Sequence, residues 1–102
     1  MNEAVLKQTI LDSIATKQRL LEQCIPSIRA LCERAVAALQ QGGKILLCGN
    51  GGSSCDAAHA AGELVGWFEV KQRRAYAAIA LGQQVPTLTA IGNDAGYEHV
   101  FA

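Results

Sequence analysis

The sequence predicts an α/β fold built on a parallel sheet, and three observations support this class. Residues 45–47 (Ile-Leu-Leu) form a short apolar run bounded by glycines, which is typical of a buried parallel strand. A second apolar run, residues 76–81, follows after a stretch with helical character. Strands that alternate with helices along a chain pair in parallel through right-handed crossover connections.

Two helices are expected ahead of the first strand. Residues 3–23 carry an intermittent apolar stripe, and residues 27–41 place their apolar side chains on one face. Pro26 marks the break between them, and Gly42-Gly43 marks the end of the second helix. A lead-in of this length has few partners within the chain. We therefore expect it to pack on a face of the sheet and against another subunit.

The first strand leads into a glycine-rich turn and then a helix. Residues 49–53 (Gly-Asn-Gly-Gly-Ser) tolerate positive φ angles and close approach of the backbone. The helix is expected to start at Ser53 or Ser54, with a serine as N-cap and Asp56 in its first turn. A strand, a glycine turn and a helix N-terminus together present backbone N–H groups to an anion, which favours a phosphorylated ligand.

His59 and Glu63 lie four positions apart on this helix, so their side chains share one face. Such a pair can bind a divalent metal, or act as acid and base beside a ligand. A histidine on an alanine-rich helix can also be a buried, hydrogen-bonded residue. The carboxylate one turn away and the glycine turn upstream favour the functional interpretation.

The loop at residues 69–74 is charged and is expected to be solvated. Its basic side chains could instead help to hold a phosphate; they are Lys71, Arg73 and Arg74. The solvated interpretation is favoured, because short exposed basic runs are common in proteins.

Beyond the second strand, Pro86 can occupy the first turn of a helix that runs to about Ile91. Gly92-Asn93-Asp94 is expected to form a polar turn, and residues 97–102 to begin another helix.

Composition limits the function classes. The 102 residues are half apolar and carry no net charge, so neither nucleic acid nor a membrane surface is an expected partner. The four cysteines are not spaced as CxxC, which favours reduced thiols. No apolar run is long enough to cross a bilayer and the first residues do not resemble a signal peptide, so a cytoplasmic location is expected.

Two visible strands are few for a parallel sheet, and the sequence stops inside an expected helix. We therefore expect residues 1–102 to be the N-terminal half of a single domain. Residues 1–42 would be the helical lead-in, and residues 43–102 the first β-α-β-α units.

Two motifs resemble a known family. Residues 49–64 (GNGGSSCDAAHAAGEL) followed by residues 89–101 (TAIGNDAGYEHVF) resemble the phosphoheptose isomerases of the sugar isomerase (SIS) superfamily. The resemblance covers essentially the whole chain and about the first half of a typical member. The ordered combination of motifs is specific, whereas GNGGS alone would be weak evidence.

The resemblance implies a flavodoxin-like three-layer α/β/α sandwich (the SIS fold) and a homotetramer with sites between subunits. It also implies conversion of sedoheptulose 7-phosphate to D-glycero-D-manno-heptose 7-phosphate, for ADP-heptose and the core of lipopolysaccharide. In such an enzyme Glu63 would be the base that moves a proton between C1 and C2 through an enediol. His59 and Glu63 would be Zn²⁺ ligands. Substrate contacts are implied at Asn50, Gly51, Gly52, Ser53, Glu63, Asn93 and Asp94.

The family's serine-rich phosphate loop and its later glutamine and histidine belong to a second half that this sequence does not contain. A chain that carries the base without them is expected to be inactive by itself.

Two other classes share parts of this pattern. One is a non-catalytic SIS module that binds a sugar phosphate or a protein, such as the replication-initiator-associating paralogues. These lack an acid at the position of Glu63, so its presence here favours catalysis. The other class comprises amino-sugar phosphate isomerases and regulators. They have the fold, but usually neither the HxxxE helix nor the Asn-Asp pair.

Overall fold

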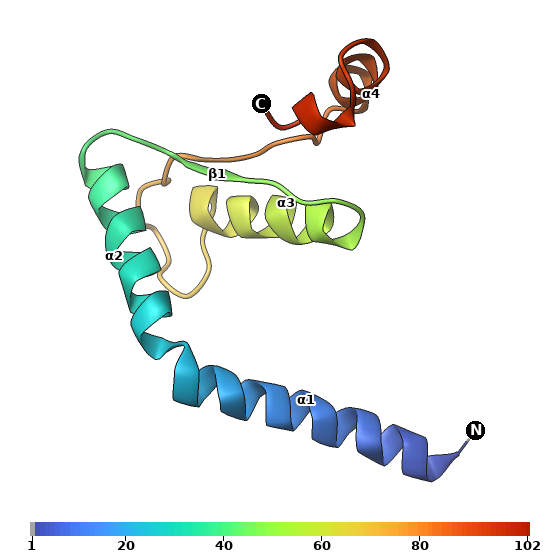
Figure 1. Cartoon of the computed structure of the whole chain (residues 1–102). Helices are drawn as coiled ribbons and strands as arrows, with labels where there is room; N and C mark the ends of the chain where they lie inside the picture. Colours follow the sequence, from blue (N-terminus) through green and yellow to red (C-terminus); the bar gives the residue numbers. More distant parts are fainter. Residues whose placement is uncertain (1) are drawn as a thin grey trace. The chain divides into compact units, whose positions relative to one another are not determined.

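A computed structural model describes residues 2–102 of the chain. The chain divides between Val36 and Ala37 into two compact units. The first unit is helical, and the second contains the sheet and the candidate site (Figure 1).

The first unit begins with helix α1 (Glu3–Gln23), and α2 (Ile25–Gln40) follows after one residue. Asn2 caps α1, because its Oδ1 accepts a hydrogen bond from the N–H of Ala4 at 2.9 Å. The predicted break beside Pro26 is confirmed. However, α2 starts at Ile25 rather than at residue 27, because proline is compatible with the first turn of a helix.

The apolar side chains of these helices are largely exposed to solvent. None of the described residues of α1 or α2 is buried. The exposed apolar residues are Val5, Leu6, Ile10, Leu11, Ile14, Leu20 and Leu21 on α1, and Ile25, Ile28, Leu31 and Val36 on α2. Among the described residues, no helix has the length and apolar character needed to cross a membrane.

The second unit is built on two short parallel strands, as predicted. Strand β1 (Ile45–Leu47) pairs with β2 (Ala78–Ala80), with Leu46 opposite Ile79. The pairing continues beyond β2, where the N–H of Leu81 donates to the carbonyl of Leu47 at 2.8 Å. Strand β2 is shorter than the apolar run at residues 76–81 suggested.

Helix α3 (Gly52–Val65) packs against both strands and runs beside β1 (Figure 1). Ala57 and Ala61, one helical turn apart, are buried in this contact. Small side chains at this spacing let the helix approach the sheet closely. With Val100, they are the buried apolar residues of the described chain.

The start of α3 differs from the prediction. The helix begins at Gly52, Gly51 is the N-cap with a φ of 54°, and no side chain caps the helix. The hydroxyl of Ser54 instead donates to the carbonyl of Gly51 at 2.7 Å. The positive φ angle of Gly51 ends the glycine-rich turn before Ser53 and Ser54. Because α3 therefore starts at Gly52, Asp56 lies beyond the first turn of the helix.

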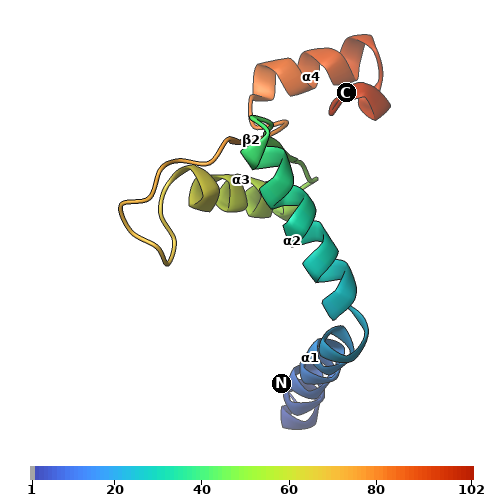
Figure 2. The same ribbon diagram turned by 90° about the vertical axis from the view of Figure 1, so that its left-hand side faces the viewer.

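Helix α4 (Val85–Asp94) follows β2 (Figure 2) and corrects a second prediction. Pro86 does lie in its first turn, as expected. The segment Gly92-Asn93-Asp94 is not a separate turn, because the helix continues through it to Asp94. One glycine is tolerated inside a helix at modest cost. The chain turns instead at Gly96, where φ is 103°.

After Gly96 the chain forms a single 3₁₀ turn, η1 (Tyr97–His99), rather than the expected α-helix. Its last hydrogen bond runs from the N–H of Val100 to the carbonyl of Tyr97, at 3.2 Å. Val100 is buried, so the end of this turn is anchored to the core.

Candidate functional site

The turn between β1 and α3 is built by two glycines with different roles. A Cβ on Gly49 would lie 2.4 Å from the carbonyl oxygen of Ser53, so only glycine fits there. Gly51 has space around it but a positive φ angle, which disfavours a side chain for conformational reasons. The sequence placed Gly49 in the turn but did not assign it to the site.

The N–H groups of this turn are partly used within it. Ser53 donates to the carbonyl of Asn50, and Ser54 to that of Gly51, each at 3.0 Å. Among the residues described, the N–H groups of Gly51 and Gly52 make no such bond. They lie at the positive end of α3, which is suited to an anionic or polar oxygen.

His59 and Glu63 share one face of α3, as predicted. The distance from His59 Nε2 to Glu63 Oε1 is 3.2 Å. The side chain of His59 is 78% exposed and that of Glu63 38%, so the interpretation of His59 as a buried histidine is wrong. With Asp56 and Ala60 they line an open hollow of about 260 Å³.

The C-terminal end of α3 is held by Arg73, a contact that the sequence did not reveal. Its Nη2 donates to the carbonyl of Glu63 at 2.6 Å, and its Nη1 to that of Leu64 at 3.0 Å. The guanidinium also lies 4.4 Å from the centre of the Tyr76 ring. Arg73 therefore binds carbonyls at the end of α3, and does not extend into a solvated loop or toward a phosphate.

Asn93 and Asp94 lie side by side in the last turn of α4, where Asn93 Nδ2 donates to Asp94 Oδ1 at 2.9 Å. Tyr97 connects this end of α4 to the glycine turn, because its hydroxyl donates to Oδ1 of Asn50. Within the described chain, no hydrogen bond or ion pair joins Asn93 or Asp94 to the His59–Glu63 pair.

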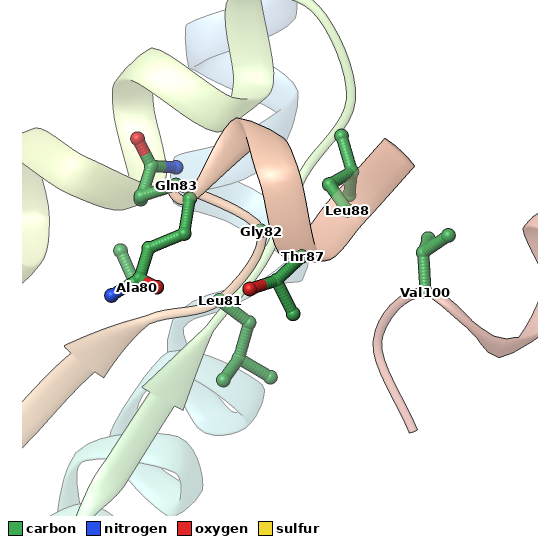
Figure 3. Close-up of a pocket in the computed structure, with 8 residues that line it drawn as sticks. Ala80, Leu81, Gly82, Gln83, Thr87, Leu88 and Val100 are labelled. Carbon is green, nitrogen blue, oxygen red and sulfur yellow. The ribbon is translucent and has the colours of Figure 1, made fainter. Parts of the chain in front are cut away.

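The loop after β2 lies at the same edge of the sheet. Gln83 Nε2 donates to the carbonyl of Ser54 at 3.1 Å, so this loop is tied to the first turn of α3. A neighbouring pocket of about 260 Å³ opens at the end of β2 and is shown in Figure 3. It is lined by Ala80, Leu81, Gly82, Gln83, Gln84, Thr87, Leu88 and Val100.

A zinc ion would find two donors at this site. Two ligands about 2.1 Å from a tetrahedral zinc are separated by about 3.4 Å, and the His59–Glu63 separation of 3.2 Å is close to this value. Protein zinc sites supply at least three protein ligands. In the part of the chain that the structure describes, no three His, Cys, Asp or Glu residues are grouped to hold a metal.

These features define an α/β protein with a glycine turn at the carboxyl end of a parallel strand, the edge at which proteins of this class bind ligands. Residues 10–102 match a family model described as the SIS domain. The chain belongs to the SIS domain family, as the sequence motifs predicted.

Curated relatives are named phosphoheptose isomerase. One from a Roseiflexus species is 51% identical over 90 residues, which cover 88% of this chain and 45% of the relative. One from Laribacter hongkongensis is 49% identical over 92 residues, covering 90% of this chain and 46% of the relative. The chain thus spans about half the length of the curated relatives that it matches.

Solved structures give the same result. The phosphoheptose isomerase of Neisseria gonorrhoeae matches 97% of this chain and 50% of its own, with a TM-score of 0.86 and 37% identity. That of Francisella tularensis matches 99% of this chain and 53% of its own, with a TM-score of 0.87 and 34% identity. The predicted SIS fold with its two leading helices is confirmed.

Proposed function

We propose that the protein provides the base and part of the substrate site of a sedoheptulose 7-phosphate isomerase. The observation that carries this proposal is the position of Glu63 beside His59, on the helix that starts at the glycine turn. Relatives named phosphoheptose isomerase support it, since they match 88% and 90% of this chain.

The reaction moves one proton from C1 to C2 and a second proton from O1 to O2. Glu63 would remove a proton from C1 of the ketose while O2 gains a proton from water or another acid, giving an enediol across C1 and C2. The Glu63 carboxylic acid would then return its proton to C2 while O1 releases its own, which leaves the carbonyl at C1 of the aldose. Positioned proton transfer of this kind contributes roughly 10²–10⁴-fold to a rate. Because the carbonyl of Glu63 is held by Arg73, the backbone that carries the base is fixed.

The polar groups around the glycine turn would bind the substrate's oxygens. The N–H groups of Gly51 and Gly52 lie at the N-terminus of α3, and Asn50 and Ser53 flank them. Asn93 and Asp94 would line the same site from the end of α4, to which Tyr97 links the turn.

Zinc is part of this proposal. His59 and Glu63 would hold the ion, with further ligands from outside the described residues. When bound, zinc would act as a Lewis acid that stabilises negative charge on the sugar's oxygens. Proton transfer would still be the role of the Glu63 carboxylate.

Self-association is proposed from the first unit. Seven apolar side chains of α1 are exposed, and exposed apolar patches of this kind mark protein interfaces. A homotetramer is the assembly proposed, in the cytoplasm, with its product used for the heptose of lipopolysaccharide core.

The proposal is tested with a chimaera and with the chain itself. The chimaera joins this chain to the half of the Neisseria gonorrhoeae enzyme that it does not match. It should isomerise sedoheptulose 7-phosphate, whereas the chain alone should bind this sugar phosphate without turnover. A folded chimaera that binds the sugar phosphate but never isomerises it would favour the non-catalytic SIS module instead.

A further inference from the structure

Tyr97 joins two parts of the site that are far apart in the sequence. Its hydroxyl donates to Oδ1 of Asn50, which lies 47 positions earlier in the turn after β1. Tyr97 lies within the second sequence motif, residues 89–101, but the proposed substrate contacts do not include it.

The surroundings of Tyr97 fix where its hydroxyl lies. Gly96, with a φ of 103°, turns the chain out of α4 immediately before it. The ring lies beside the last turn of α4, since a Cβ on Gly92 would be 4.0 Å from Tyr97 Cδ2. Three residues after Tyr97, Val100 donates the hydrogen bond that closes the 3₁₀ turn, and its side chain is buried.

The hydrogen bond from Tyr97 determines what Asn50 can offer to a ligand. A primary amide has one accepting oxygen and a nitrogen with two N–H groups. Because the oxygen accepts from Tyr97, the amide is held in one orientation, and its nitrogen keeps both N–H groups for a ligand. Asn50 is thereby held as a hydrogen-bond donor, beside the N–H groups of Gly51 and Gly52.

We infer that Tyr97 is a positioning residue, which orients the Asn50 amide so that its nitrogen donates to an oxygen-rich ligand. Tyr97 acts through Asn50 and needs no contact with the ligand. The effect on sugar phosphate binding rests on the proposed function, whereas the orientation of the amide does not.

The first experiment measures binding of sedoheptulose 7-phosphate by calorimetry. Tyr97→Phe keeps the ring beside Gly92 and removes only the hydroxyl. It should weaken binding by roughly 3- to 10-fold, the equivalent of one net hydrogen bond. The matched control is Tyr76→Phe, which removes a hydroxyl from the tyrosine stacked on Arg73 and should leave binding unchanged.

A double-mutant cycle separates positioning from a general structural effect. In an Asn50→Ala background, Tyr97→Phe should cause no further loss of binding, because the amide that it orients is gone. An equal loss in both backgrounds would show that Tyr97 acts on the fold rather than through Asn50, and would overturn the inference.

The second experiment needs no ligand. The side-chain amide resonances of Asn50 in a ¹H–¹⁵N spectrum should shift in Tyr97→Phe, while the backbone resonances of α3 stay in place. Unchanged Asn50 resonances, or a Tyr97→Phe protein that fails to fold, would overturn the inference. If the wild-type protein does not bind the sugar phosphate, the proposed function fails, and the resonances still decide the role of Tyr97.

Discussion

Gly49 offers a sharp test of how the turn is built. In Gly49→Ala, the new Cβ would lie 2.4 Å from the carbonyl oxygen and 2.5 Å from the carbonyl carbon of Ser53. Ordinary contact begins at 3.4 Å, so the start of α3 must move by about 1 Å. The clash is with backbone, and no side-chain rotation can relieve it.

The cost follows from this displacement. Overpacking of this kind destabilises a protein by about 1–3 kcal/mol. For a unit the size of residues 37–102, the melting temperature changes by roughly 4–8 °C for each kcal/mol. We therefore expect Gly49→Ala to melt roughly 8–16 °C below the wild type, for a loss of about 2 kcal/mol. The same movement displaces the N–H groups of Gly51 and Gly52, so binding of the sugar phosphate should weaken too.

Gly62→Ala is the matched control. A Cβ on Gly62 meets nothing within 4 Å, and this glycine lies inside α3. Alanine is favoured over glycine in a helix by about 1 kcal/mol, so this variant should melt at or above the wild-type temperature. Thermal unfolding followed by circular dichroism measures both variants. If Gly49→Ala melts at the same temperature as the wild type, the close approach of Gly49 to Ser53 does not determine the turn, and the predicted clash is refuted.

Three further predictions concern Arg73, His59 and the exposed apolar face of α1. Arg73→Ala should lower the free energy of unfolding by about 2 kcal/mol, because two carbonyls of α3 lose a charged donor, whereas Arg74→Ala should change it little. Equal denaturation midpoints for the two variants would contradict the role given to Arg73. His59→Ala in the chimaera should weaken zinc binding by at least roughly 10-fold by metal titration, and unaltered affinity would remove His59 from the ligand set. Ile14→Lys on α1 should reduce self-association in sedimentation velocity, while Arg19→Ala on the opposite side of the helix should not. An Ile14→Lys protein that assembles like the wild type would exclude this face from the interface.

Local patterns in the sequence predicted the strand pairing and the shared helix face of His59 and Glu63 correctly. The apolar runs of β1 and β2 paired in parallel as expected, because βαβ connections leave few alternatives. The four-residue spacing of His59 and Glu63 placed both side chains on one face of α3, because a helix has 3.6 residues per turn.

The boundaries of helices were harder to predict. Two serines after the glycine turn suggested an N-cap, but the left-handed Gly51 took that position. Gly92-Asn93-Asp94 has the composition of a turn, yet α4 continues through it. In both places, the composition indicated that a turn was close. The positive φ angles of Gly51 and Gly96 decided where each turn fell.

Contacts between distant residues were not predicted at all. Arg73 reaches carbonyls nine and ten positions away, and Tyr97 reaches Asn50 across 47 positions. Neither contact follows a helical or strand period, so no local pattern encodes it. Their effect is nevertheless on predicted site residues: Arg73 holds the backbone of Glu63, and Tyr97 orients Asn50.

The most direct test of the central claim is the rate at which the chimaera isomerises sedoheptulose 7-phosphate, with and without Glu63→Gln. Glutamine keeps the size and polarity of the side chain but cannot remove a proton from carbon. We expect kcat to fall by roughly 100-fold or more, while the sugar phosphate still binds. A Glu63→Gln chimaera that turns over at the wild-type rate would show that Glu63 is not the base, and would contradict the account.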